Sequence, residues 1–340
     1  MRSLLLVKLS ALGDVVQTLP VLSALKRAYP ELEIDWVVEE QNAEILEGHP
    51  LIRRLLVFPR RRILRLLRSA SGFRTGISLF KRFVAELRRE TYEVVLDLQG
   101  LLKSALVVSL ARSGRKVGFA NHREGSTLPL TEKLPAYDPE LHAVRRYLSA
   151  AVYLGGIAEP VEFPMADYPS AGELSQSLGL PAPPWLVFVP ATRWPTKLWT
   201  RAGWQGLARR ASGLGYPLIW IGGAGDREYV DSLAVQGFNL CGRLGLKELA
   251  GVLSGAAAVV SVDTGPMHLA AALGRPIVAL FGPTAPWRTG PFGNQHRLLR
   301  KALPCSPCFR KSCPEPKCLT GFSPEEVFTV LKEILEHSKA

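Results

Sequence analysis

The chain contains a polar corner, in the sequence VVSVDTGPMH, where an apolar, β-branched run stops and a helix is expected to begin at once. Pro266 suits the first turn of that helix, because an N–H group there would have no partner within the helix. The backbone N–H groups of Thr264 and Gly265 then point out of a helix N-terminus, where the dipole favours an anion. Asp263 and His268 place an acceptor and a titratable donor beside it. The corner indicates either a phosphate site or a capped helix with Asp263 as its N-cap.

A second corner follows the first apolar run of the chain. Gly13 permits a tight turn there, and Asp14 stands where the next helix is expected to start. A carboxylate in this place can take a proton from a substrate hydroxyl as a general base. Gln17, three residues further on, supplies the structural alternative, in which Asp14 belongs to a capping box.

Two further corners carry groups that suit a nucleotide. The loop ATRWPTKLW offers the hydroxyls of Thr192 and Thr196 and the charge of Lys197 to a phosphate, although it lacks the glycines of a Walker loop. The turn GGAGDRE can admit a ribose or a base against its backbone, with Asp226 or Glu228 holding sugar hydroxyls. Each loop alone could equally be an ordinary polar surface loop. Together with the FGPT corner near the end of the second half, however, they favour one nucleoside-diphosphate site.

Four of the five cysteines form a cluster with the spacing C-x2-C-x4-C-x4-C, at Cys305, Cys308, Cys313 and Cys318. Four thiolates could hold a structural zinc ion in tetrahedral geometry. The alternative is a structural loop without metal, and disulfides are not expected in a reducing cytosol. We expect no catalytic role for the cluster.

Short apolar runs alternate with helical patterns along the chain, which is typical of βαβ units and parallel sheets. We expect strands at Leu4–Val7, Ile34–Val38, Leu55–Phe58, Val94–Leu98, Lys116–Phe119, Trp185–Val189, Leu218–Ile221, Ala258–Val262 and Pro276–Phe281. A proline-rich stretch separates two such halves. We therefore predict an α/β fold of two Rossmann-like, doubly wound domains, at residues 1–160 and 185–322, with a linker at 161–184 and a final helix within 323–340. Ligands of such sheets bind beyond the carboxyl ends of the strands, which is where the corners fall.

Composition indicates a folded, soluble protein, because 47% of the 340 residues are apolar and 21% are charged. Its apolar runs are too short to be a signal peptide or to cross a membrane, which predicts a cytoplasmic location. The net charge is +12, and seven arginines without an acid lie between Arg53 and Arg68. Such a run indicates an anionic partner, either nucleic acid, an anionic membrane or a polyanionic substrate, unless it is simply a solvated basic helix.

The chain resembles the ADP-heptose:lipopolysaccharide heptosyltransferases over nearly its whole length. The resemblance rests on five segments in order: Lys8-x4-Gly13-Asp14-Val15, Trp36–Glu40, Asp97–Ser104, Thr192-x4-Lys197-x-Trp199 and Asp263-Thr264-Gly265-x2-His268. The second and third of these segments are present in full, which favours the family members that add the first heptose of the inner core.

This resemblance implies a GT-B architecture, in which two Rossmann-like domains face an interdomain cleft and the final helix packs back on the first domain. It implies transfer of L-glycero-D-manno-heptose from ADP-heptose to Kdo of Kdo2-lipid A, with inversion at the anomeric carbon and without a required cofactor or catalytic metal. The enzyme would act as a peripheral protein on the cytoplasmic face of the inner membrane, with its anionic surface as a partner.

The resemblance also implies roles for individual residues. Asp14 matches the general base, and Lys197 matches a catalytic ligand of the donor diphosphate. The other donor residues are Thr192, Thr196, Asp226, Glu228, Asp263, Thr264, Gly265 and His268. The acceptor residues are Arg60, Arg61, Arg62, Gln99, Lys103, Arg123 and Arg146.

Three other functions remain open at this point. A second heptosyltransferase, or another core sugar transferase of the same family, would use the same corners. A nucleotide-sugar epimerase would leave the arginine run unexplained. A nucleic-acid-binding protein would use the basic run and the cysteines, but the sequence shows neither an aromatic stacking platform nor a recognition helix, so no nucleic acid is expected.

Overall fold

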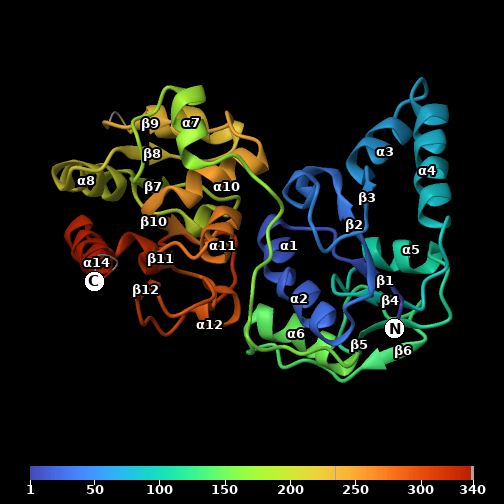
Figure 1. The fold of residues 1–340 in the computed structure, drawn as a ribbon. Coiled ribbons are helices and arrows are strands. Elements are labelled where there is room, and N and C mark those ends of the chain that lie inside the picture. The colour runs from blue at the N-terminus through green and yellow to red at the C-terminus, as the bar shows by residue number, and fades with distance from the viewer. Residues whose placement is uncertain (234, 338–340) are drawn as a thin grey trace. The chain divides into compact units, whose positions relative to one another are not determined.

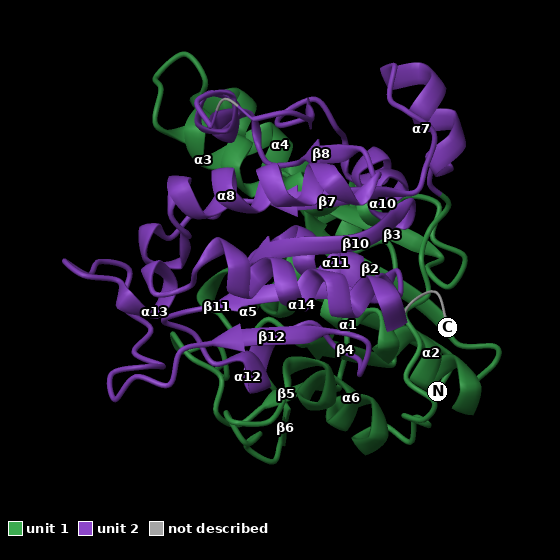
Figure 2. Ribbon diagram, turned by 90° about the vertical axis from the view of Figure 1, so that its left-hand side faces the viewer, with its two compact units in different colours: residues 1–167 green, residues 168–340 purple. Residues whose placement is uncertain are grey.

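The computed structural model describes residues 1–233 and 235–337. The described residues form two compact units, unit 1 up to residue 167 and unit 2 from residue 168 (Figure 1). Figure 2 shows the two units in different colours. Each unit has a six-stranded parallel sheet with helices on it, which confirms the predicted α/β class with two Rossmann-like units.

Unit 1 has the strand order β3-β2-β1-β4-β5-β6 (Figure 1). The central strands read as unbroken apolar runs, as expected when both faces of a parallel sheet are covered. The strands are β1 (Ser3–Val7), β2 (Glu33–Glu39), β3 (Arg54–Phe58), β4 (Val94–Asp97), β5 (Lys116–Phe119) and β6 (Glu132–Leu134). The helices are α1 (Leu12–Thr18), α2 (Pro20–Ala28), α3 (Arg60–Leu67), α4 (Phe73–Leu87), α5 (Leu102–Leu110) and α6 (Ala143–Tyr153).

Unit 2 has the order β12-β11-β10-β7-β8-β9, which is the same order as in unit 1 when its strands are counted from β7. The strands are β7 (Trp185–Val189), β8 (Leu218–Trp220), β9 (Phe238–Asn239), β10 (Ala256–Val262), β11 (Ile277–Phe281) and β12 (Arg297–Arg300). The helices are α7 (Ala171–Leu178), α8 (Arg201–Ala211), α9 (Arg227–Asp231), α10 (Leu246–Ser254), α11 (Gly265–Ala272), α12 (Pro286–Thr289), α13 (Lys317–Thr320) and α14 (Pro324–His337).

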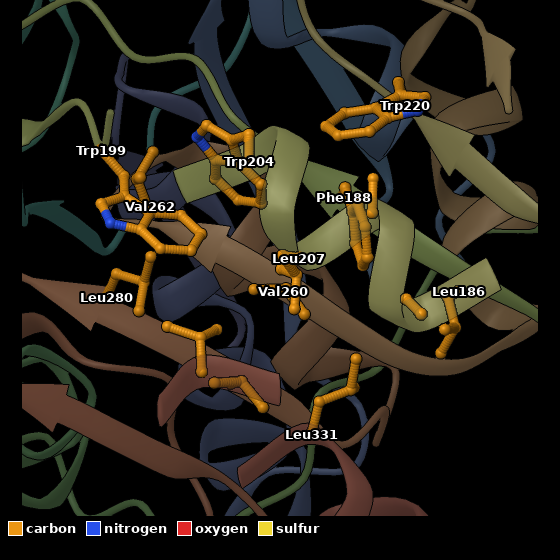
Figure 3. Close-up of a cluster of buried hydrophobic side chains, with 14 of the residues drawn as sticks. Leu186, Phe188, Trp199, Trp204, Leu207, Trp220, Val260, Val262, Leu280 and Leu331 are labelled. Carbon is orange, nitrogen blue, oxygen red and sulfur yellow. The ribbon is translucent and has the colours of Figure 1, made fainter. Parts of the chain in front are cut away.

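Large aromatic side chains fill the core of unit 2 between its sheet and α8. The ring of Trp204 lies 5.2 Å from that of Trp199 and 6.0 Å from that of Trp220, and Phe188 meets Trp220 edge to face (Figure 3). Such rings bury a large apolar area each and prefer these tilted contacts. These rings form the packed core that supports the loops after the strands of unit 2.

All nine expected strands are present, and three short ones were missed. The missed strands, β6, β9 and β12, lie at sheet edges, and β6 and β12 carry charged residues while β9 has two residues. Edge strands need only one buried face and often carry charge, so they leave a weak apolar signal.

The predicted linker contains a helix that was not expected, whereas the final helix begins and ends where it was predicted. The boundary between the units falls inside the segment 161–184, but that segment also contains α7, which begins at a Ser170–Glu173 capping box and packs on α10. The final helix has the expected bounds. Its apolar face, with Val327 and Leu331, packs in the core of unit 2 against α8, and its packing on the first domain stays a prediction. Among the described residues, no helix is long and apolar enough to cross a membrane.

Candidate active site

The predicted acceptor residues of unit 1 follow the carboxyl ends of its strands. Asp14 comes after β1, the three arginines begin α3 after β3, and Gln99 and Lys103 come after β4. The strand order reverses between the neighbours β1 and β4, which is the place where open α/β sheets bind their ligands. The fold thus gathers these side chains at one edge of the sheet.

Asp14 lies half-buried in the first turn of α1, with one hydrogen bond to each carboxylate oxygen. Its Oδ2 accepts from the backbone N–H of Ala11 at 3.0 Å, and its Oδ1 accepts from the hydroxyl of Tyr147 at 3.1 Å. The N-cap of α1 is Ala11, and Asp14 is the third helical residue, whose carboxylate accepts from the N-cap N–H as in a capping box. Asp14 thus has the structural role considered above, although in place of the Glu or Gln of the box and not as the N-cap. An ionised carboxylate has about four acceptor positions. Two positions therefore remain for a substrate hydroxyl.

Tyr147 connects Asp14 to a buried cation. The Nζ of Lys8 donates to the Tyr147 hydroxyl at 2.7 Å and to the Leu98 carbonyl at 2.8 Å. Burial lowers the pKa of Lys8 to about 8, although the charges of Asp14 and Asp97 oppose the shift. Burial, with the charge of Asp14, raises the pKa of Tyr147 well above its ordinary value, so its hydroxyl stays a donor. Neither residue was predicted for the site, although Lys8 opens the first family segment.

Asp97 ends β4 and holds the loop that carries Gln99. Its Oδ1 accepts from the N–H groups of Gln99 at 2.8 Å and Gly100 at 3.1 Å, and its Oδ2 accepts from the Ser104 hydroxyl. Burial raises its pKa to about 6, although these hydrogen bonds favour the ionised form. The loop therefore rests on a buried acid that titrates in a mildly acidic range.

Replacing Asp97 by asparagine is expected to remove one component of the pH dependence of stability. The folded protein holds the Asp97 proton up to a pH of about 6 and the unfolded chain only to 3.8, so protonation stabilises the fold at low pH. This stabilisation, about 3 kcal/mol, is lost as the pH rises from about 4 to about 6. Urea unfolding across that range should show wild type losing stability relative to Asp97→Asn. Parallel curves for the two proteins would contradict the assignment.

Glu39, at the end of β2, organises the cations of this edge. Its Oε1 accepts from Lys103 Nζ and from Arg60 Nε, both at 2.9 Å, and Lys103 also donates to the Ser10 hydroxyl. Burial raises the pKa of Glu39, but these two cations outweigh burial and bring it below its ordinary value. Glu39 was part of a family segment but was not predicted as a site residue. Its ion pairs join residues far apart in the chain, which no local pattern shows.

Gln99 acts on the backbone of the loop after β1. Its Oε1 accepts from the N–H groups of Leu9 and Ser10, at 3.0 and 2.9 Å. These bonds fix the turn that precedes Asp14. Gln99 therefore lies at the sheet edge where the acceptor was predicted, but its side-chain oxygen accepts hydrogen bonds from the loop after β1.

The arginine run divides into two groups with different surroundings. Arg53 and Arg54 pair with acids from other elements, among them Asp35 and Glu86. On α3, Arg61 and the neighbouring Arg62, Arg65 and Arg68 are exposed, and within the described residues no ion pair involves them. The run is therefore less basic than its sequence indicates, and its unpaired charge lies on α3.

The remaining two acceptor candidates lie further along this edge. Arg123 is exposed in the loop after β5, and its backbone N–H donates to the Gly100 carbonyl at 3.1 Å. Arg146, on α6 beside Tyr147, has its guanidinium 4.9 Å from the ring centre of Tyr137. Its Nε is buried without a hydrogen-bond partner among the described residues. Arg146 thus contributes positive charge close to Lys8 and Asp14.

Asp263 is the centre of the corresponding edge in unit 2. Its Oδ2 accepts from Lys197 Nζ at 2.7 Å and from the Thr284 hydroxyl at 2.6 Å, and its backbone carbonyl accepts from the Thr192 hydroxyl at 3.3 Å. The N-cap of α11 is Thr264, so the side chain of Asp263 is not a cap. Thr284 belongs to the FGPT corner and was not predicted as a site residue. The corners after β7, β10 and β11 are thus joined through one carboxylate.

The start of α11 has the form expected of an anion site. Thr264 makes no side-chain cap, and the helix runs from Gly265 with Pro266 in its first turn. His268 is buried within it. The first N–H groups of a helix have no carbonyl partner inside the helix. These groups and Lys197 therefore lie at the same edge.

The loop after β7 is held by residues that follow β12. The Thr196 hydroxyl donates to the Arg310 carbonyl at 2.7 Å, so Thr196 is buried in support of the loop. The ring of Trp194 lies 4.6 Å from Lys197 Nζ and 5.2 Å from Lys311 Nζ. Lys311 adds a second cation that the sequence did not single out.

The two acids of the glycine-rich turn have different surroundings. Asp226 accepts from the Gly223 N–H at 2.7 Å and so closes the turn after β8, while Glu228 is exposed in α9. The turn therefore engages Asp226 and leaves Glu228 at the surface.

The cysteine cluster forms a loop against the FGPT corner. The N–H groups of Cys308 and Phe309 donate to the Pro283 carbonyl at 3.0 and 2.8 Å. Cys305 and Cys313 are exposed, whereas Cys318 is buried in the core of unit 2. In the described part of the chain, no three histidine, cysteine or acidic residues are grouped so as to hold a metal ion. The four-thiolate site and the loop without metal, both considered above, stay predictions.

Comparison with known proteins gives relatives along the whole chain. The model of glycosyltransferase family 9 (heptosyltransferase) matches residues 80–319. Lipopolysaccharide heptosyltransferase 1 of Pseudomonas aeruginosa is 36% identical over 355 residues, covering 97% of each protein. The Escherichia coli heptosyltransferase WaaC with ADP is 29% identical with a TM-score of 0.78, covering 98% of this chain and 99% of that one. Its structure with ADP-2-deoxy-2-fluoro heptose is 30% identical with a TM-score of 0.77, covering 97% and 99%.

Proposed function

We propose that this chain, which belongs to glycosyltransferase family 9, the heptosyltransferases, adds the first heptose of the lipopolysaccharide inner core. The donor is ADP-heptose and the acceptor is Kdo of Kdo2-lipid A. Similarity over the full length to lipopolysaccharide heptosyltransferase 1 supports this substrate pair. The observation that carries the mechanism is the Asp14 carboxylate, which is held at a sheet edge with acceptor positions left for a hydroxyl.

In the proposed reaction, Asp14 takes the proton of the acceptor hydroxyl while the hydroxyl oxygen attacks the anomeric carbon of the heptose. The bond from that carbon to the ADP oxygen breaks, and ADP leaves with the bonding electrons. Attack from the face opposite the leaving group inverts the anomeric carbon. Lys8 and Tyr147 are positioning residues, since they hold the base without contacting the reacting atoms.

The proposal assigns the donor to the edge of unit 2. Lys197 and the first N–H groups of α11, at Thr264 and Gly265, stabilise the negative charge that grows on ADP. Thr192 adds a hydroxyl next to Asp263, and His268 completes this corner from within α11. Thr196 supports the loop through Arg310. Asp226 and Glu228 are the candidates for the ribose hydroxyls. These groups supply the charge stabilisation, so the proposed reaction assigns no step to a metal ion or an organic cofactor.

The proposal assigns the acceptor to the edge of unit 1. Arg60, Lys103, Arg123 and Arg146 surround the loops next to Asp14, and Arg61 and Arg62 extend the positive charge along α3. Carboxylates of Kdo and phosphates of lipid A are anions of the kind that arginine binds with two hydrogen bonds. We infer that the enzyme meets this acceptor as a peripheral protein at the anionic cytoplasmic face of the inner membrane.

The double substitution Arg61→Ser, Arg62→Ser is expected to weaken binding to anionic vesicles by about 30-fold and to raise the KM for the acceptor. The basis is about 1 kcal/mol for each cation near an anionic surface. Arg60 is kept because it holds Glu39. The affinity for ADP should not change. Vesicle sedimentation, steady-state kinetics and calorimetry with ADP measure the three quantities.

The control for this pair is Arg201→Ser, Arg209→Ser on α8, which removes the same charge from exposed positions of unit 2. It should leave vesicle binding and acceptor KM nearly unchanged. An equal loss in both double variants would mean that net charge alone causes the effect, and no loss in either would exclude α3 from acceptor binding.

Incubation of Kdo2-lipid A with the enzyme and ADP-heptose, followed by mass spectrometry and assignment of the linkage, tests the proposed reaction. One heptose joined to Kdo is the expected product. A product formed only from an acceptor that already carries heptose would instead identify the second heptosyltransferase.

A further inference from the structure

Unit 1 contains a cavity of about 1080 Å³ between the pair of helices α3 and α4 and the helix α5. The two helices lie side by side next to β3, the edge strand of the sheet (Figure 1). The walls are mainly apolar and include Ile63, Leu67, Phe80, Ala105 and Leu106. A volume of this size is at the upper end of cavities that enclose small organic ligands. The proposed mechanism uses none of this space.

The cavity adjoins the acceptor edge. Arg60 and Lys103 both line it, and both also bind the carboxylate of Glu39. The acid among the lining residues is Glu124, whose carboxylate accepts from the Leu102 N–H at 3.1 Å. The lining of an apolar space therefore includes two cations that belong to the acceptor edge.

Exposed leucines surround the cavity where it meets solvent. Leu64, Leu102, Leu106 and Leu128 all line it, and their exposed fractions are 42%, 65%, 44% and 88%. Apolar side chains gathered at the surface in this way mark a binding site more often than scattered ones do. Leu64 lies on α3 among the exposed arginines, so the same helix offers apolar and cationic surface.

We propose that this cavity takes up an alkyl chain of the lipid acceptor. The inference rests on the proposed function and extends it from the sugar to the lipid part of the acceptor. The apolar walls exclude a polar occupant, because unpaired polar groups would lose their hydrogen bonds to water there. The lining cations Arg60 and Lys103 and the exposed arginines of α3 match an anionic head group attached to that chain. An anionic lipid is the ligand that satisfies both features, whereas an acidic peptide would leave the apolar walls unfilled.

A series of n-alkyl phosphates tests the binding directly, without catalysis. Affinity should rise by about fourfold for each added methylene, from about six to about fourteen carbons, until the cavity is full. Calorimetry below the micelle concentration measures this slope. The substitution Ser109→Trp, which places a large side chain at the lining of the cavity, should flatten the slope at shorter chains.

Ser149→Trp is the matched control. Both serines are exposed on a helix of unit 1, and both donate to a carbonyl of the same helix, Ser109 to Ala105 and Ser149 to Arg146. Ser149 does not line the cavity. A second pair is Leu106→Glu, which places a carboxylate at the lining of the cavity, and Val152→Glu, which places one on the exposed side of α6. The rise of affinity with chain length should end at shorter chains in the first member of each pair and stay as in wild type in the second.

Activity with two acceptors then links the cavity to the reaction. Ser109→Trp should raise the KM for Kdo2-lipid A at least tenfold and leave kinetics with its fully deacylated form unchanged. Equal losses with both acceptors, or no loss with either, would overturn the proposal, as would wild-type binding that ignores chain length. Wild type that binds the alkyl phosphates with the expected slope but transfers no heptose to either acceptor would support the cavity and refute the proposed function.

Discussion

Replacement of Asp14 by asparagine is expected to lower the turnover of heptosyl transfer by at least ~100-fold, the usual scale for a positioned general base. Asparagine keeps the shape of the side chain, and its oxygen can still accept from Ala11 N–H or Tyr147. The fold and the affinity for ADP should therefore stay near those of wild type. Rapid-quench kinetics, thermal unfolding and calorimetry with ADP measure the three properties.

The variant Tyr147→Phe tests how much of the catalysis by Asp14 depends on the hydrogen bond from Tyr147. This variant removes the hydroxyl between Lys8 and Asp14 but leaves the carboxylate in place. Its turnover should fall less than that of Asp14→Asn, and its pH–rate profile should shift, because the environment of the base changes. If Asp14→Asn is mostly unfolded and its folded fraction turns over normally, Asp14 is a structural residue and the base lies elsewhere.

Replacement of Lys197 by alanine is expected to have the second large effect, on both ADP binding and turnover. A hydrogen bond to a charged group is worth about 1.5–3 kcal/mol, which corresponds to about 10- to 150-fold in affinity for ADP. Turnover should fall further, because the charge on ADP grows as it leaves. Asp263 keeps its bond from Thr284 in this variant, so the corner should remain folded.

Two other lysine variants make the Lys197 result specific. Lys197→Arg retains the charge with a different geometry and should lose less than alanine does. Lys317→Ala removes an exposed lysine that pairs with Glu315 and should bind ADP as wild type does. Unchanged ADP affinity and turnover in Lys197→Ala would exclude this lysine from the donor site.

The sequence predicted the elements of the fold well because apolar runs mark strands that are covered on both faces. It also predicted which loops matter, because corners at the carboxyl ends of parallel strands meet at one edge. Thr192 and Lys197 lie 71 and 66 residues from Asp263 in the chain and are joined to it in the structure for this reason.

Contacts between distant acids and bases could not be read from local patterns. The run from Arg53 to Arg68 contains no acid, yet its first two arginines are paired by acids from other elements. Glu39 and Thr284 are central to their edges only because other strands bring partners to them. Family membership decides between the enzyme and the nucleic-acid-binding alternative, which composition alone left open.

The two sheets share one strand order, so equivalent corners can be compared between the units. In unit 1 a lysine, Lys8, follows the first strand and an acid, Asp97, ends the fourth. In unit 2 the corresponding strands, β7 and β10, are followed by Lys197 and Asp263. Lys8 is buried against Tyr147 and the Leu98 carbonyl in unit 1, whereas Lys197 and Asp263 form an ion pair at the proposed donor edge of unit 2. The proposed function assigns the donor to unit 2 and the acceptor to unit 1, and each unit carries a complete sheet. We therefore expect mutations in one unit to alter the preference for one substrate while the other unit keeps its chemistry, so that donor and acceptor specificity can evolve or be engineered one at a time.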